Sequence, residues 1–260
     1  CSYTFTEVTP DGSNADSYFN TEAEYQSALI GAYDLLQATF WNTLTSVVAS
    51  DDYAAGGDSF NLDQPTLQNV NQMIHTPNDE NQLREIWGLM YAGFNRANYI
   101  LEFKDKTDFA GKEEIIAEAY FLRAYYTFEL VKFFGNVPLK TEERGGVMRI
   151  SDERILTEDE FSMERIADIP TAYGVIAADL LEAIPNLPST QDRPYEATKG
   201  AAQALLGKVY LYHGTYDASK FTDAASTLKQ VISSGQYALT TGDDYLNMFE
   251  IEGENGPEAV

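Results

Sequence analysis

The sequence predicts an all-α fold in which helix pairs are joined by long irregular loops. Apolar residues recur at the i, i+3, i+4 and i+7 spacing of an amphipathic helix between Leu83 and Phe94. Residues 112–134 are apolar around most of the helix circumference, which is typical of a helix enclosed by other helices. No stretch alternates apolar and polar residues clearly enough to predict a strand.

The first predicted helix begins at Thr21, where Glu24 completes a capping box, and runs to about Thr39. Residues 50–80 then form a long polar loop, including Pro65. A loop of this length is uncommon in a compact domain unless it has a function, and the alternative is a plain surface excursion.

Helical periodicity returns at about residues 79–104 and again at 112–134, where Gly135 and Pro138 end the second helix. A charged excursion follows over residues 140–168. The remaining helices are expected at about 173–184, 198–213 and 221–233, with a proline-rich loop over 185–196.

The chain divides into two parts of very different character. Residues 1–20 are polar and rich in turn formers, so we expect an N-terminal tether over the surface. Residues 21–260 are expected to form one helical-repeat domain, because a chain of 260 residues that is 44% hydrophobic can bury a sizeable core.

The clearest repeat signature runs over residues 201–239. It resembles the tetratricopeptide repeat, with a Leu-Gly-x-x-Tyr motif from Leu206 to Tyr210 and small and large residues such as Ala224 and Leu228 on the second helix. Small residues let two helices approach closely. The motif's Trp is replaced by Gln203, and the turn before the second helix is longer than usual.

A single repeat cannot bury its own apolar face, so other helix pairs must stack on it. The helices at about 79–104 and 112–134 are the expected neighbours. Tetratricopeptide arrays supply binding surfaces and no catalytic group, which leaves a protein- or peptide-binding scaffold as one interpretation of the function.

The charge balance narrows the range of partners. Asp and Glu number 41 against 17 Lys and Arg, a formal net charge of −24. Such a chain repels phosphate backbones and anionic lipid surfaces, so we expect no nucleic-acid partner and no peripheral membrane docking. Neutral ligands such as sugars remain compatible with this charge.

Cysteine and histidine are too scarce for a disulfide framework or a metal site. Cys1 is the single cysteine, and the two histidines lie far apart in sequence. Asp11, Asn14 and Asp16 fit no standard calcium loop, so we expect no metal and no cofactor. A first-position cysteine is typical of a bacterial lipoprotein after signal-peptide cleavage, and the alternative is an arbitrary boundary.

Several motifs together resemble the SusD/RagB family of surface glycan-binding lipoproteins of Bacteroidetes-type bacteria. The most specific motif is Ala-Glu-Ala-Tyr-Phe-Leu-Arg-Ala-Tyr-Tyr at 117–126, followed by Phe-Gly-Asn-Val-Pro-Leu at 134–139. Weaker motifs agree in order and spacing, and they lie at residues 21–33, 87–101, 176–180, 201–216 and 231–237.

The resemblance implies tetratricopeptide-like helix pairs with a loop-rich part, and a lipid anchor on Cys1 as the sole membrane attachment at the outer-membrane surface. It also implies a SusC-like TonB-dependent channel as partner and an oligosaccharide, or in some members a peptide, as ligand. Family members continue beyond residue 260, so we expect the chain to be the N-terminal portion of such a protein.

Sugar binding requires exposed rings for stacking and polar groups for hydroxyls, held on a rigid base. The loop after the first helices offers Asp51, Asp52, Tyr53 and Phe60, and the proline-rich loop offers Tyr195. The alternative for each is an ordinary surface residue, and no family motif assigns a specific ligand contact here.

We expect no enzymatic activity. Glu118 and Arg123 lie in the strongest motif, and we interpret them as charged residues that tie a buried helix to its neighbours. A glycoside hydrolase would need two carboxylates at a defined separation, but carboxylates are too common in this chain for their pairing to be informative.

Overall fold

The computed structural model describes residues 17–57, 63–76, 81–139, 165, 168–253 and 256–260. These residues form helices and no strand, which confirms the predicted all-α fold. The elements are α1 (Glu22–Asp34), η2 (Leu35–Ala38), α2 (Thr39–Val48), α3 (Pro65–Asn71), α4 (Asn81–Glu102), α5 (Lys112–Phe134), α7 (Ile169–Ala183), α8 (Lys199–His213), α9 (Lys220–Ser233), α10 (Asp243–Asn247) and η3 (Ile251–Gly253).

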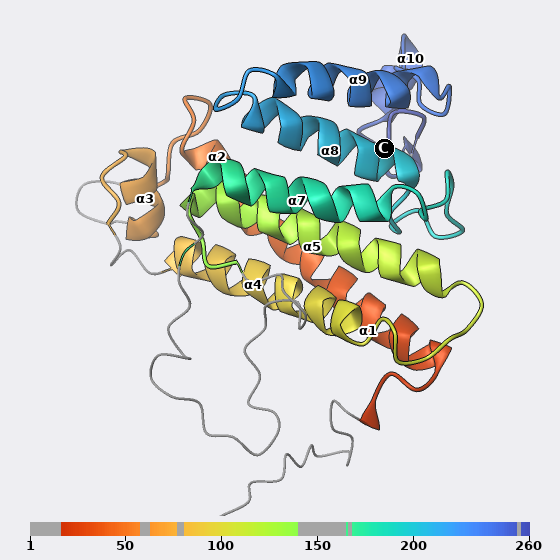
Figure 1. Ribbon diagram of the computed structural model, residues 1–260. Helices are drawn as coiled ribbons and strands as arrows, with labels where there is room; N and C mark the ends of the chain where they lie inside the picture. Colours follow the sequence, from red (N-terminus) through yellow and green to blue (C-terminus); the bar gives the residue numbers. More distant parts are fainter. Residues whose placement is uncertain (1–16, 58–62, 77–80, 140–164, 166–167, 254–255) are drawn as a thin grey trace, which may run out of the picture.

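Helix α5 is the centre of the domain. It packs against α1, α4, α7 and α8, and its Leu122, Tyr126 and Leu130 side chains are fully buried. Figure 1 shows α9, α8, α7, α5 and α4 side by side in this order, while α1 and α2 cross behind them. The prediction that this helix is enclosed by neighbours is therefore confirmed.

The predicted capping residues begin their helices. The Glu24 backbone N–H donates to the Thr21 hydroxyl, and the Glu24 carboxylate accepts from the Thr21 N–H at 2.8 Å, which completes the capping box of α1. Thr198 caps α8 by accepting from the Ala201 N–H at 3.1 Å. Gly135 ends α5 at φ +67°, a conformation that favours glycine.

Two elements differ from the sequence-based expectation. The helix predicted to run to Thr39 tightens into the 3₁₀ turn η2 after Asp34 and restarts as α2. The expected loop over residues 50–80 contains the short helix α3, which begins with Pro65 at its first turn.

The α8–α9 pair packs as the repeat signature predicts. A Cβ added at Gly207 would lie 2.5 Å from the Leu228 side chain, so a larger residue here would force Leu228 to shift or the two helices to move apart. Leu206 is buried in the same pair. α8 in turn packs on α7, which packs on α5, so the hairpin is joined to the central helix.

A buried ion pair ties α5 to its neighbours. The Arg123 guanidinium donates to both Asp179 carboxylate oxygens of α7, at 2.6 and 2.8 Å, and to the Asn98 amide oxygen of α4 at 2.9 Å. Glu118 does not pair with Arg123 but accepts from the Tyr33 hydroxyl of α1. Both residues therefore connect α5 to other helices, as their structural interpretation predicted.

The expected boundary at residue 20 stays a prediction. Within the described residues, however, Phe19 is only 3% exposed and packs against Tyr25 and Phe103. In the part of the chain that the structure describes, no helix is long and apolar enough to cross a membrane.

Candidate functional site

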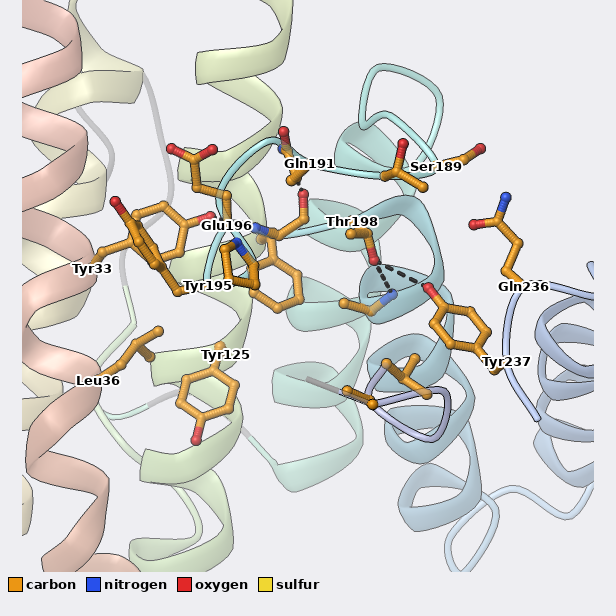
Figure 2. A pocket seen from close by; sticks show the side chains of 18 of the residues that line it. Tyr33, Leu36, Tyr125, Ser189, Gln191, Tyr195, Glu196, Thr198, Gln236 and Tyr237 are labelled. Atoms are coloured by element: carbon orange, nitrogen blue, oxygen red, sulfur yellow. Dashed lines mark hydrogen bonds between the residues drawn. The ribbon is translucent and has the colours of Figure 1, made fainter. Parts of the chain in front are cut away.

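A hollow of about 760 Å³ opens between the α1–α2 junction, α5, the proline-rich loop and two segments near the carboxyl end of the chain. Figure 2 shows its side chains converging from these elements. The carboxyl-end wall is held together by a hydrogen bond of 2.9 Å from the Ala238 N–H to the Pro257 carbonyl. The volume lies in the range of small-molecule sites.

Aromatic rings supply much of the hollow's surface. Tyr195, predicted from the sequence as a ligand contact, is 61% exposed and lies in its lining. Its ring centre lies 6.5 Å from that of Tyr33 in an edge-on arrangement, and the Arg193 guanidinium lies 5.8 Å from it. Tyr195 is thus supported by neighbours while most of it remains accessible for stacking.

The polar groups of the hollow are anchored rather than free to rotate. The Thr198 hydroxyl lies 3.3 Å from the Tyr237 hydroxyl, and the Gln191 amide donates to the Ala197 carbonyl at 3.0 Å. Glu196 forms an ion pair of 2.8 Å with Arg193. Hydroxyl, amide and carboxylate groups therefore stand at fixed positions beside the rings, as sugar recognition requires.

Gly200 makes room for one of these rings. A Cβ at this position of α8 would lie 2.7 Å from Cε2 and Cζ of Tyr237, well inside contact distance. The absence of a side chain at Gly200 therefore lets Tyr237 lie against the start of α8, next to Thr198 (Figure 2).

Glu118 of α5 is only 3% exposed and is linked to the hollow through Tyr33, a lining residue. Burial, together with the nearby Glu196 and Glu114 carboxylates, raises its pKa from 4.5 to about 7, although the Tyr33 hydroxyl and Arg193 act in the opposite direction. The Tyr33 hydroxyl donates to Glu118 Oε2 at 2.5 Å. Burial also raises the pKa of Tyr125, which does line the hollow, to about 12.

The second predicted set of ligand residues lies elsewhere. Asp51, Asp52 and Tyr53 are exposed at the end of α2, and Asn71 of α3 donates to the Tyr53 carbonyl at 3.3 Å. Thr39, which lines the hollow, begins α2, so about 15 Å of helix separates the two places. Phe60 and Cys1 lie outside the described residues, and all these assignments stay predictions.

Comparison with known proteins decides the family. A family profile described as starch-binding and associating with outer membrane matches residues 4–211. The chain belongs to the SusD-like family.

Individual relatives agree with this assignment. SusD-like protein P38 of Formosa agariphila is 27% identical over 269 residues, covering 98% of this chain and 48% of that protein. A laminarin binding SusD-like protein of known structure is 32% identical with a TM-score of 0.71, covering 89% of this chain and 50% of that one. The fold also matches surface glycan-binding protein A from Bacteroides thetaiotaomicron in complex with laminarihexaose, at 24% identity, a TM-score of 0.74, and coverage of 91% and 48%.

This SusD-like chain spans about half the length of the relatives that it matches. Tyr53 and Tyr195 both lie within the stretch that matches the family, whereas Tyr237 lies beyond it. The hollow is therefore lined by residues inside the stretch that matches the family profile and by residues beyond it.

Of the tyrosines that line the hollow, the sequence singled out Tyr195 as a ligand candidate, which stays a prediction, and did not single out its neighbours. Tyr33 lies in the first predicted helix, and Tyr125 in the stretch 112–134 that was expected to be enclosed by other helices. Both are half-buried at the edge of the hollow. The tyrosine hydroxyls on otherwise apolar helix faces were the signal that could have pointed to these residues, because a buried tyrosine usually directs its hydroxyl to a hydrogen-bond partner.

Proposed function

We propose that this SusD-like chain binds a neutral oligosaccharide, with Tyr195 as a stacking ring in the hollow and Tyr53 as a second exposed ring. The observation that carries the proposal is the exposed Tyr195 ring, supported by Tyr33 and Arg193 beside anchored polar groups. A glucan of the laminarin type is the first ligand to test, because the 32% identical relative carries laminarin binding in its name.

The preference for a neutral ligand follows from charge. The chain has a net charge of −24, and no Lys or Arg is among the described residues that line the hollow. Glu196 adds a carboxylate to that lining. An acidic glycan would meet an unfavourable field, and Arg193, the cation beside Tyr195, is already paired with Glu196.

We further propose that the chain delivers its ligand to a SusC-like TonB-dependent channel at the cell surface, with a lipid on Cys1 as its membrane anchor. Family membership and the family's description as associating with outer membrane support this location. The role is binding and delivery, without catalysis, as the binding functions in the names of relatives suggest.

The alternative of a protein-binding scaffold rests on the α8–α9 repeat alone. In that hairpin the small residue Gly207 serves internal packing, because the Leu228 side chain occupies the space beside it. The relatives with known structure or curated names are SusD-like proteins, one of them named for laminarin binding, which favours glycan binding over a scaffold role. The scaffold would regain support if the chain bound soluble proteins and no glycan.

Isothermal titration with laminarihexaose tests the proposed site. Tyr195→Ala should weaken binding by about tenfold, the effect of removing an aromatic hot-spot side chain. Tyr216→Ala is the matched control, since this tyrosine is 55% exposed but lies outside the lining of the hollow. Equal affinities for wild type and Tyr195→Ala would remove Tyr195 from the site.

A further inference from the structure

The proline-rich loop is fastened to the helical core at one residue next to Tyr195. Ala197 is 4% exposed, and both of its backbone polar groups are used. Its carbonyl accepts from the Gln191 amide at 3.0 Å, and its N–H donates to the Tyr33 hydroxyl at 2.7 Å. The second bond joins residues that lie 164 positions apart in sequence.

The Tyr33 hydroxyl is at the same time a donor. It gives its only hydrogen to Glu118 Oε2 at 2.5 Å while its oxygen accepts the Ala197 N–H. The hydroxyl therefore links α1, α5 and the loop in one chain of hydrogen bonds. Donation to a carboxylate also makes the oxygen a better acceptor, because consecutive hydrogen bonds polarise each other.

We propose that Tyr33 and Glu118 are positioning residues that hold the loop segment 195–197, and thereby the Tyr195 ring, in place at the edge of the hollow. Without the Tyr33 hydroxyl, the buried Ala197 N–H has no partner, and exposing it to water requires the segment to move. The expected loosening of segment 195–197 follows from the hydrogen-bond geometry alone. The expected effect on ligand binding rests on the proposed function.

The charges around Glu118 make the arrangement sensitive to pH. Tyr33 reaches it from α1, Arg193 and Glu196 act on it from the loop, and Glu114 acts from its own helix. Because burial and Glu196 of the loop favour the protonated carboxyl more than Arg193 opposes it, protonation of Glu118 should hold the segment closed more tightly. A merely structural contact would show no such titration.

The test uses Tyr33→Phe in the full chain, which deletes one oxygen and keeps the ring. Tyr25→Phe is the matched control, because its hydroxyl also comes from α1 but donates to the Phe103 carbonyl. Backbone amide exchange of Ala197, measured by NMR as a protection factor, reports the segment. Titration with laminarihexaose reports binding.

We expect Tyr33→Phe to lower the Ala197 protection factor and the laminarihexaose affinity by about fivefold each, the effect of one lost hydrogen bond. Tyr25→Phe should change neither. The wild-type protection factor should rise as the pH drops through about 7, and this dependence should vanish in Glu118→Gln.

Unchanged Ala197 protection in Tyr33→Phe would overturn the proposal. Lost protection with unchanged affinity, in a protein where Tyr195→Ala weakens binding, would overturn the link to the ligand and leave the proposed function intact. If the wild type does not bind laminarihexaose, the proposed function fails, and the exchange data alone decide whether Tyr33 holds the segment.

Discussion

The buried carboxyl of Glu118 predicts an unusual dependence of stability on pH. Its pKa is about 7 in the folded chain against 4.5 for an ordinary glutamate. Between these two pH values the folded state holds a proton that the unfolded state releases, so the free energy of unfolding falls as pH rises through this window. At about 1.4 kcal/mol per pH unit, the loss is on the order of 3 kcal/mol and is complete above pH 7.

Glu118→Gln removes this titration while keeping an oxygen that accepts from Tyr33. Urea denaturation, followed by circular dichroism between pH 4 and 8, gives the free energy of unfolding of both proteins. The difference, variant minus wild type, should rise by about 3 kcal/mol across the window, since only the wild type loses stability there through this group.

Glu113→Gln is the control, because Glu113 lies on the same helix but is exposed. Its difference from wild type should change by less than about 1 kcal/mol over the same range. A flat difference for Glu118→Gln would refute the reasoning, because it would mean that burial does not favour the protonated carboxyl.

Two further predictions concern packing. Gly207→Ala should destabilise the chain by about 1–3 kcal/mol in urea denaturation, because its methyl group would overlap Leu228. Gly174→Ala is the control, since a Cβ there meets nothing within 4 Å, and it should stabilise the chain by up to about 1 kcal/mol. Equal effects of the two substitutions would contradict the role of Gly207 in packing. Arg123→Met should lower the free energy of unfolding by about 3–5 kcal/mol, because it leaves Asp179 buried without its cation. Adding Asp179→Leu to this variant should recover part of that loss. If the double variant instead loses the sum of what Arg123→Met and Asp179→Leu lose singly, the ion pair is not the cause.

Local sequence signals predicted those elements whose ends are chemically marked. α5 begins and ends where the apolar stretch and Gly135 indicate, and the hydroxyls of Thr21 and Thr198 cap the helices that follow them. The break at η2 was not predictable in this way, since residues 35–38 contain no Gly or Pro. η2 packs against α4, a contact between segments far apart in sequence that no local signal in residues 35–38 marks.

The candidate site was predictable only in part for a similar reason. Tyr195 could be proposed as a ligand contact because it lies in a proline-rich loop, and the structure places it, exposed, in the lining of the hollow. Its support by Tyr33, and the place of Tyr237 in the opposite wall, depend on residues that are far apart in sequence and meet only in the folded chain. Periodicity places a residue on a helix face, but it does not say what covers that face.

The most direct test of the proposed function is a pair of titrations of the wild-type chain at about 0.15 M salt, a physiological ionic strength. Laminarihexaose represents the neutral oligosaccharides, and an oligogalacturonate of the same length represents the acidic ones. We predict saturable binding of laminarihexaose and no binding of the acidic oligomer. Binding of the oligogalacturonate alone would contradict it.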